Sequence, residues 1–507
     1  MVATEFSTTR PGSLLRSEER TNLAVVVLAT GLAAALALLF IGDKCLWLDE
    51  GASMYFAHDV PRLWERLVHR EANMWLYYLL LSLWLRLGDS ETVARGLSAL
   101  FATAAVPVTY VLGRRLFGSW AGAIASLLLA SHSYLIHYAQ QVRGYTLLVF
   151  LVALSSYFFL RAVDEGSRRA WVGYGVAMGL AIHTHFFAAL VYLAHLLAVL
   201  LVGKMPSHWR GLLLSTAILA VFLVPIALWQ PLSNDQIPWV LPLTAQRLFW
   251  FFGQMTGGSR PLLLLYAIFW ILALVSVARK RTEHASPQER WHHLFVLAWI
   301  VVPVAVAAGF SLLVKPVFVD RFLIVVLAPL VLLAGAGIAR VRPRWLCVLI
   351  LLLFLGGSTR GLNRWYSAGG SDDWTGATTY VLSRTRTGDG AVFHVGGGKR
   401  CFDYYCSRWG GRACPTTLDL VRETTVGRTR KFQLDSQRLS SLPNTYDRIW
   451  LLLSHDSAFP FDRAGILNSL AHHFVLQSER DFKSITVQLY QKSALSDPSP
   501  PLLEGAR

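Results

Sequence analysis

Apolar segments long enough to cross a membrane recur along the chain from Leu23 to about Leu355. A helix needs about 20 largely apolar residues to span the hydrocarbon core of a bilayer, so each such segment is typical of a transmembrane helix. The composition agrees, because 54% of the 507 residues are hydrophobic and 15% are charged, whereas about a quarter of the residues in a soluble domain are charged. The sequence therefore predicts a polytopic α-helical membrane protein.

The composition becomes ordinary after about residue 357, where charged residues and glycines alternate with short apolar runs. This change predicts a C-terminal domain outside the bilayer. The first apolar segment is too long for the core of a signal peptide, so we expect it to be retained as a helix. The expected domains are a cytoplasmic tail at 1–21, a transmembrane domain at 22–357 with its first outer loop at 42–91, and an extracytoplasmic α/β domain at 358–507.

The net charge of +16 does not require a nucleic-acid partner, because the basic residues are scattered among short loops. Cytoplasmic loops carry an excess of Lys and Arg. Alternate polar joints hold sixteen such residues and the short joints between them hold five, so we place the first set in the cytoplasm. This assignment predicts eleven membrane spans, and an odd number puts the C-terminal domain outside. The spans are expected at 22–41, 92–112, 119–137, 144–162, 170–184, 185–203, 211–229, 261–278, 294–314, 322–340 and 345–357.

One further apolar segment, at 74–88, is only fifteen residues long. If it crossed the membrane, every later joint would change sides and the arginine pairs would face outward. We expect it to form a half-immersed helix on the outer surface, together with the amphipathic stretch at 63–69.

Within the C-terminal domain, apolar runs suited to strands alternate with helical patterns, which favours a small α/β layer fold. Strands are expected at "AVFHVG" and "RIWLLLS", and Ser371 is expected to cap a helix before them. A helix around "AGILNSLAHH" and strands near "FVLQS" and "SITVQLYQ" follow. We expect the last twelve residues to be disordered.

Three of the five cysteines, Cys401, Cys406 and Cys414, fall within fourteen residues of this domain. We expect a disulfide among them, because disulfides persist outside the cytoplasm. A zinc site that includes His394 is the alternative, but the spacing matches no compact ligand pattern.

Polar residues gather at the joints that this topology places on the outer face. Asp49 and Glu50 follow the first apolar segment closely, and "VKPVFVDRF" carries Lys315 and Arg321. Ionisable groups near the bilayer are costly and usually mark a pathway or a site. The other candidates at outer joints are Gln140, Gln141, Arg143, Tyr145, His183, His185 and Asp320.

These residue types favour one kind of chemistry. A pair of carboxylates can serve as a general base for an acceptor hydroxyl, or can bind a hard cation such as Mg²⁺ or Mn²⁺. Arginine binds phosphate oxygens through two parallel hydrogen bonds, so Arg143 and Arg321, with Lys315, can hold a phosphate. A base and a phosphate site at the outer membrane surface predict sugar transfer from a lipid-linked phosphosugar. The metal requirement stays open.

Simpler interpretations remain for the same residues. The two acids can mark a helix boundary, and the arginines can anchor helices by extending their side chains to the headgroups. His183 and His185 can be polar residues at a tight turn. Packing roles alone are expected for His132 and His195.

The stretch "LWLDEGASMYFA" resembles the first-loop signature of bacterial glycosyltransferases of the family 39 type, which are similar to protein O-mannosyltransferases and lipid A aminoarabinose transferases. Four more stretches follow the order and spacing of that family, so the resemblance covers roughly residues 20–345. They are "VARGLSALFATAAVPVTYVLGRRLFG", "YAQQVRGYTLLVFLVALSSYFFLRA", "HTHFFAALVYLAHLL" and "DRFLIVVLAPLVLLAGAGI".

The resemblance implies the membrane fold of the C-type glycosyltransferases and transfer from a polyprenyl-phosphate sugar with inversion of configuration. It implies that Asp49 is the catalytic base with Glu50 beside it, and that Arg143 and Arg321 lie near the donor phosphate. It also brings in Gln140, Gln141 and Tyr145 as substrate contacts.

The chain departs from this family at one place. Many relatives have "HPPLYY" where this chain has "ANMWLYY" at residues 72–78, so the histidine and both prolines are absent. Asn73 is at most a partial replacement for the substrate contact of that motif.

The leading hypothesis is an inner-membrane glycosyltransferase that acts on a lipid, polysaccharide or protein hydroxyl outside the cytoplasm. A transporter or flippase of lipid-linked sugars is the alternative, although the sequence lacks the paired halves with interrupted helices that many transporters have. A third hypothesis, an inactive anchor that displays a binding domain, leaves Asp49, Arg143 and Arg321 without a shared purpose.

Overall fold

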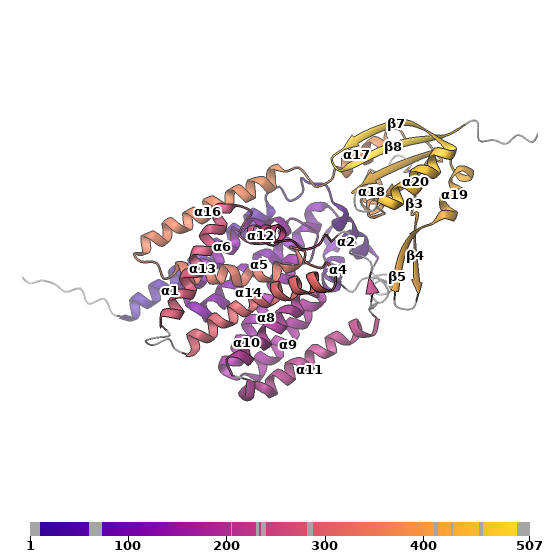
Figure 1. Cartoon of the computed structure of the whole chain (residues 1–507). Coiled ribbons are helices and arrows are strands. Elements are labelled where there is room, and N and C mark those ends of the chain that lie inside the picture. The colour runs from indigo at the N-terminus through magenta and orange to yellow at the C-terminus, as the bar shows by residue number, and fades with distance from the viewer. Residues whose placement is uncertain are drawn as a thin grey trace, which may run out of the picture. The chain divides into compact units, whose positions relative to one another are not determined.

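Two compact units make up the chain in its computed structural model (Figure 1). The helical unit contains Met1–Gly42, Asp59–Gln230 and Val240–Ala368, and the C-terminal unit contains Asp43–His58, Pro231–Trp239 and Gly369–Arg507. The predicted amphipathic stretch at 63–69, the first ten residues and the last twelve lie outside the described residues. The structure describes residues 11–59, 73–203, 205–229, 233–234, 240–280, 287–394, 396–409, 414–426, 429–455 and 460–493.

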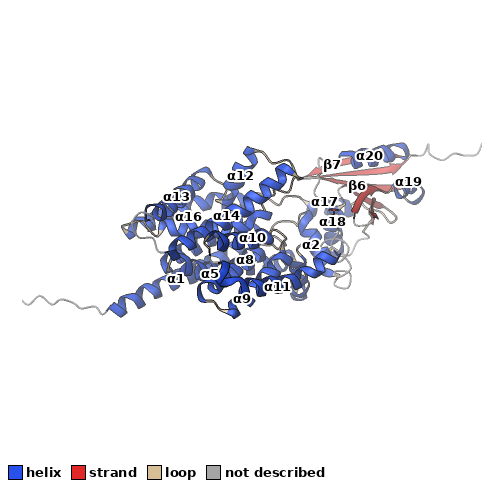
Figure 2. Ribbon diagram, turned by 60° about the horizontal axis from the view of Figure 1, so that its bottom comes forward, coloured by secondary structure: helices blue, strands red, loops and turns tan. Residues whose placement is uncertain are grey.

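The described part of the helical unit contains helices and no strands (Figure 2). Its elements are α1 (Pro11–Leu38), α4 (Trp75–Trp84), η1 (Leu85–Leu87), α5 (Glu91–Phe117), α6 (Ser119–Ala130), α7 (Ser133–Ala139), α8 (Tyr145–Glu165), α9 (Arg168–Thr184), α10 (Ala188–Leu201), α11 (Met205–Trp229), α12 (Ala245–Met255), α13 (Arg260–Lys280), α14 (Pro287–Leu313), η2 (Phe322–Val326), α15 (Leu327–Ile338) and α16 (Arg344–Ser367).

Five helices of the described residues are long and apolar enough to cross a membrane: α5, α8, α14, α16 and the Glu19–Leu38 part of α1. Two bent pairs, α6 with α7 and α12 with most of α13, raise the number to seven if each pair is one span. Four shorter apolar helical stretches occur as well, one of them at Trp75–Leu87. The count of eleven spans therefore stays a prediction.

The expected span at 119–137 is broken, and its two helices are bent by 56°. The His132 side chain causes a new helix to start here, because its Nδ1 accepts a hydrogen bond from the main-chain amide of Tyr134 (3.3 Å). Its Nε2 meets the carbonyl of Met255 at 3.1 Å. His195 is also buried and hydrogen-bonded, to Ser156 and Tyr174. The packing roles expected for both histidines agree with these contacts.

Small residues allow the helices of this unit to approach closely. A Cβ atom added at Gly113 of α5 would lie 2.7 Å from the Cα atom of Gly122 of α6. One added at Gly335 of α15 would lie 2.7 Å from the carbonyl oxygen of Ala121. Membrane helices associate through such small residues, because lipid gives no hydrophobic advantage to larger ones.

The C-terminal unit combines strands with helices. Its elements are α2 (Leu48–His58), β1 (Ser233–Asn234), α17 (Trp374–Leu382), β2 (Gly390–His394), α18 (Gly397–Arg408), β3 (Thr416–Leu418), β4 (Val421–Val426), β5 (Thr429–Leu434), α19 (Ser436–Thr445), β6 (Arg448–Ser454), α20 (Pro460–His473), β7 (Phe474–Phe482) and β8 (Ile485–Lys492). The larger sheet has the strand order β3-β2-β6-β8-β7, and a smaller one has the order β1-β5-β4.

The larger sheet is mixed, since β3, β2 and β6 run parallel and β8 pairs antiparallel with both β6 and β7. Every residue of β2 and β6 is buried, which is expected for parallel strands that are covered on both faces. On one face, Val392 and Leu451 pack with apolar residues of α19 and α20. On the other, Trp450 packs against Tyr380 of α17 at 6.1 Å between ring centroids.

Three boundaries differ from the sequence prediction. The helix α16 continues to Ser367, so the C-terminal unit begins at Gly369 instead of residue 358. Part of the expected first outer loop, Asp43–His58, belongs to the C-terminal unit. The cap of α17 is Asp373 and not Ser371, because the Asp373 carboxylate accepts a hydrogen bond from the amide of Gly376 (2.8 Å).

Of the three cysteines considered above, Cys406 and Cys414 form a disulfide and Cys401 is a buried free thiol. The prediction of at least one pair among the three is confirmed. Within the described residues, no group of three or more His, Cys, Asp or Glu side chains can hold a metal ion.

Candidate functional site

The acidic pair lies in the first turn of α2, in the C-terminal unit. The helix begins after Trp47, whose carbonyl accepts the first helical hydrogen bond, from the amide of Gly51 (2.9 Å). Glu50 is 1% exposed, and its carboxylate accepts a hydrogen bond from the main-chain amide of Trp47 (3.3 Å). A Glu at the third helical position that reaches back to the cap is half of a capping box. Glu50 therefore fixes the start of the helix.

Asp49 is half-buried and precedes Glu50 by one position. Its main-chain carbonyl accepts a hydrogen bond from the Ser53 hydroxyl (3.0 Å). A carboxylate in the first turn is stabilised by the partial positive charge of the helix N-terminus. The two acids thus have different surroundings, and Asp49 is the more accessible of the two.

The arginines lie in the helical unit. Arg143, between α7 and α8, is 8% exposed, and its guanidinium donates to the hydroxyl of Tyr78 (3.4 Å). The same guanidinium lies 5.7 Å from the centroid of the Tyr145 ring. The main-chain carbonyl of Arg143 accepts a hydrogen bond from the hydroxyl of Ser98 in α5 (3.1 Å). These contacts from α4, α5 and α8 hold Arg143 in place inside the protein.

Arg321 comes immediately before η2, and its guanidinium lies 5.6 Å from the ring centroid of Phe322. The Phe322 ring packs on His185, with centroids 4.7 Å apart. The His185 ring also lies 6.1 Å from the ring of Tyr145, which the Arg143 guanidinium contacts. The structure thus brings together two arginines that are far apart in the sequence.

Three buried polar atoms around these arginines have no hydrogen-bond partner within the described residues. They are the hydroxyl of Tyr145, Oε1 of Gln141 and Nε2 of His185. The rings of Tyr145 and His185 are 6.1 Å apart. Buried polar groups are nearly always hydrogen-bonded. The Tyr145 hydroxyl and Nε2 of His185 can donate to an anionic group held by the two arginines, whereas Oε1 of Gln141 can only accept and suits a hydroxyl of the same ligand.

Other predicted substrate contacts have partners inside the protein. Gln140 donates to the carbonyls of Ala37 (3.1 Å) and Leu39 (2.6 Å) and accepts from the indole of Trp365 (2.7 Å). It therefore ties the end of α1 to α16. His183 uses Nε2 to contact the carbonyl of Phe222 of α11 at 2.8 Å. These contacts favour structural roles for both residues, and their predicted roles as substrate contacts stay predictions.

Of the two remaining predicted site residues, Asn73 has a hydrogen-bond partner inside the protein, whereas Lys315 is exposed. Asn73 accepts a hydrogen bond from the amide of Phe186 (3.4 Å), and so supports the turn that carries His185. Lys315 is exposed in the loop after α14. Asp320, in the same loop, is half-buried, and this burial raises the pKa of its carboxyl group, although Arg247 and Arg321 act in the opposite direction.

Tyr78, which contacts Arg143, was not among the site residues predicted from the sequence. The signal that points to it is the pair of tyrosines that this chain keeps from the "HPPLYY" motif.

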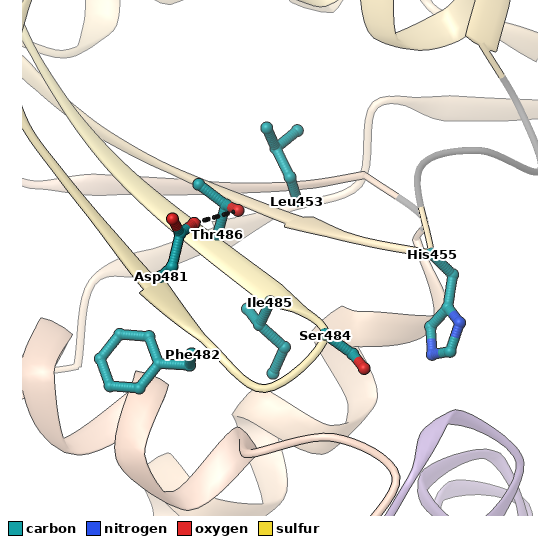
Figure 3. Close-up of a pocket in the computed structure, with 7 residues that line it drawn as sticks. All are labelled: Leu453, His455, Asp481, Phe482, Ser484, Ile485 and Thr486. Atoms are coloured by element: carbon teal, nitrogen blue, oxygen red, sulfur yellow. Dashed lines mark hydrogen bonds between the residues drawn. The ribbon is translucent and has the colours of Figure 1, made fainter.

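A pocket of about 330 Å³ lies in the C-terminal unit and is lined by Leu453, His455, Asp481, Phe482, Ser484, Ile485 and Thr486 (Figure 3). None of the predicted site residues lines it. Its polar groups are already engaged: Asp481 accepts from Thr486 (2.6 Å), and Ser484 donates to the carbonyl of Ser371 (3.0 Å). The pocket therefore offers few groups to a ligand.

The chain has the membrane fold of the C-type glycosyltransferases. ArnT from Cupriavidus metallidurans in the apo state is similar, with a TM-score of 0.61 and 15% identity over 92% of this chain and 97% of that one. ArnT bound to undecaprenyl phosphate gives a TM-score of 0.59, at 15% identity over 94% and 99% of the two chains. The oligosaccharyltransferase AglB from Archaeoglobus fulgidus, in complex with an inhibitory peptide and a dolichol-phosphate, gives 0.53 at 12% identity over 95% and 75%.

The sequence also matches a family description. Residues 73–229 match the model of the dolichyl-phosphate-mannose-protein mannosyltransferase family. No curated protein matches the chain. The matched range contains Arg143, Tyr145 and His185 but not the acidic pair. The resemblance to the family 39 type is confirmed, and the chain is an integral membrane protein.

Proposed function

We propose that this protein is an integral-membrane glycosyltransferase that moves a sugar from a polyprenyl-phosphate carrier to a hydroxyl of an extracytoplasmic acceptor. The observation that carries the proposal is the group of buried, unsatisfied polar atoms close to Arg143 and Arg321. Arg143 and Arg321 provide the cations that a phosphate needs. The Tyr145 hydroxyl can donate to a phosphate oxygen, and so can Nε2 of His185, because Nδ1 of that ring accepts from the amide of Phe187. Oε1 of Gln141 can only accept, and it suits a hydroxyl of the sugar. The undecaprenyl phosphate of ArnT and the dolichol-phosphate of AglB support the same class of carrier.

The proposed reaction is a single displacement. The Asp49 carboxylate takes the proton of the acceptor hydroxyl while its oxygen bonds to the anomeric carbon. The bond between that carbon and the phosphate oxygen breaks, and the electron pair leaves with the polyprenyl phosphate. Arg143 and Arg321 stabilise the charge of the leaving phosphate. Because the attack comes from the face opposite the leaving group, the configuration inverts.

In this proposal Glu50 fixes the start of α2, whereas Asp49 performs the proton transfer. Lys315 has an exposed side chain and is assigned to the headgroup or phosphate of the lipid. Tyr145, Gln141 and His185 are assigned hydrogen bonds to the donor, and Asn73 is assigned the support of the His185 turn.

We place the protein in the cell membrane with the C-terminal unit outside the cytoplasm. The Cys406–Cys414 disulfide supports that orientation, because disulfides are rare in the cytoplasm. A reporter that is active only outside the cytoplasm should be active when fused after Arg507 and inactive when fused after Arg115. The opposite pattern would reverse the orientation.

The central experiment measures sugar transfer by the purified protein. Undecaprenyl-phosphate sugars with different radiolabelled sugars are supplied one at a time with an envelope extract as the source of acceptors. We expect one donor to lose its label to the extract, and Asp49→Asn to lower turnover by about 10²–10⁴-fold with undecaprenyl phosphate affinity unchanged. Movement of the intact donor across vesicles without transfer would indicate a transporter instead.

The same assay tests for a divalent cation. Chelation followed by addition of Mg²⁺ or Mn²⁺ compares turnover with and without the metal. The mechanism above assigns no step to a cation, so we expect turnover to survive chelation.

A further inference from the structure

The acidic helix α2 packs against α18, a helix that follows it by about 350 residues in the sequence. The two helices approach each other closely at Gly51, the residue directly after the acidic pair. A Cβ atom built on Gly51 would lie 2.5 Å from Sγ of Cys401, 3.3 Å from its amide nitrogen and 3.5 Å from its Cα. Real Cβ atoms essentially never come closer than 3.0 Å to another heavy atom. Any larger residue at position 51 therefore requires the sulfur of Cys401 or the backbone of α2 to shift.

Two more contacts hold α2 to α18 on either side of this point. Before the helix, the main-chain amide of Leu46 donates to the buried hydroxyl of Tyr405 (2.8 Å). Later in the helix, the guanidinium of Arg400 lies 5.2 Å from the ring centroids of both Tyr55 and Phe56. A cation over aromatic faces is attractive. Residues of α18 thus contact α2, and the residues just before it, at three places.

The Cys401 thiol is a neutral spacer in this interface. Burial raises the pKa of Cys401 well above its usual value, and the charges of Asp372 and Glu50 raise it further. The thiol therefore stays protonated and adds no negative charge to this interface. A side chain of this kind serves packing and does not serve as a nucleophile.

We propose that Cys401, through its contact with Gly51, is a positioning residue that sets where the Asp49 carboxylate stands. This inference rests on the proposed role of Asp49 as the base. A methyl group at position 51 displaces the first turn of α2 away from α18, and a displacement of about 1 Å can lower turnover by about 10²-fold. The site of the donor phosphate, in the helical unit, does not depend on this contact.

The test is a double-mutant cycle with Gly51→Ala, Cys401→Ala and the two combined. Gly51→Ala should lower kcat by about 10²-fold. Removal of the sulfur leaves the nearest atom 3.3 Å from the new methyl, so the double variant should recover to the level of Cys401→Ala alone. The affinity for undecaprenyl phosphate should be equal in all three. Gly397→Ala is the matched control, because its Cβ would meet Leu48 of α2 at 3.8 Å, an ordinary contact.

Hydrogen exchange of the α2 amides provides a second measurement, which does not require the lipid-linked sugar. Gly51→Ala should lose protection at 48–58, and the double variant should regain it. If Gly51→Ala does not accumulate, Tyr405→Phe is used in its place, because it removes the hydrogen bond from the Leu46 amide without adding volume. The kcat of Tyr405→Phe should fall roughly three- to tenfold.

These experiments test the positioning role of Cys401 separately from the role of Asp49 as the base. Wild-type exchange and kcat in Gly51→Ala, or a double variant as slow as Gly51→Ala, overturn the positioning role of Cys401. Wild-type turnover in Asp49→Asn overturns the role of Asp49 as the base, whatever Gly51→Ala does.

Discussion

Replacement of Glu50 tests how the two acids divide their work. Its carboxylate is 1% exposed and accepts a hydrogen bond from the Trp47 amide. A hydrogen bond to a charged group contributes about 1.5–3 kcal/mol to stability. Glu50→Ala removes this acceptor entirely, whereas Glu50→Gln keeps an oxygen atom that can accept from the same amide. We therefore expect the Ala variant to lose about 1.5–3 kcal/mol and the Gln variant to lose less.

In a unit of this size, each kcal/mol shifts the unfolding midpoint by about 2–4 °C. The midpoint of Glu50→Ala should thus fall by about 3–12 °C. Thermal unfolding of purified protein measures this shift, with undecaprenyl-phosphate sugar turnover measured on the same samples. Asp49→Asn is the comparison, because Asp49 is the proposed base and should affect turnover more than stability.

The expected pattern is a slow but stable Asp49→Asn, a less stable Glu50→Ala, and a Glu50→Gln that turns over within about tenfold of the wild type. The reasoning would be refuted by a Glu50→Gln variant that melts like the wild type and turns over as slowly as Asp49→Asn. In that case Glu50 would be the base and the cap would be incidental.

Three more predictions concern contacts described above. Arg143→Ala should weaken undecaprenyl phosphate binding by about 10- to 150-fold. Arg143→Lys should weaken it by less, because Lys keeps the charge but not the two parallel hydrogen bonds. Equal affinities of the variants and the wild type in a binding titration would show that Arg143 only anchors the turn between α7 and α8. Gln140→Ala should destabilise the helical unit by roughly 1–3 kcal/mol without changing the affinity of the folded protein, and a selective loss of affinity would restore Gln140 as a substrate contact. The paired change Cys406→Ser and Cys414→Ser should destabilise the C-terminal unit by about 2–3 kcal/mol; an unfolding curve that coincides with the wild type, or two free thiols in native membranes by alkylation, would contradict it.

Much of the architecture could be predicted from local patterns. Helices were predictable from apolar length, because a chain in lipid must satisfy its backbone hydrogen bonds within each segment. The strands β2 and β6 were predictable from short, bounded apolar runs, and the structure has them at Gly390–His394 and Arg448–Ser454. The break at His132 was not, because it depends on a side chain that caps a new helix and reaches the carbonyl of Met255.

The site shows the limit of such reasoning in two neighbouring residues. Gln140 and Gln141 have the same side chain and the same predicted role. The structure gives Gln140 partners on α1 and α16, whereas Oε1 of Gln141 is buried without one in the described residues. The direction of each side chain follows from the turn between α7 and α8, and no local pattern encodes it.

The sequence by itself determined that the chain is a membrane protein with an acidic pair after its first apolar segment, because composition and apolar length are local properties. Only the tertiary structure decided that this pair belongs to the C-terminal unit. The hydrogen bond from Leu46 to Tyr405 joins residues 359 positions apart, and the close approach of Gly51 to Cys401 spans a similar distance along the chain. Contacts of this kind depend on how two helices fit side by side, which is a property of packed surfaces and not of either segment alone.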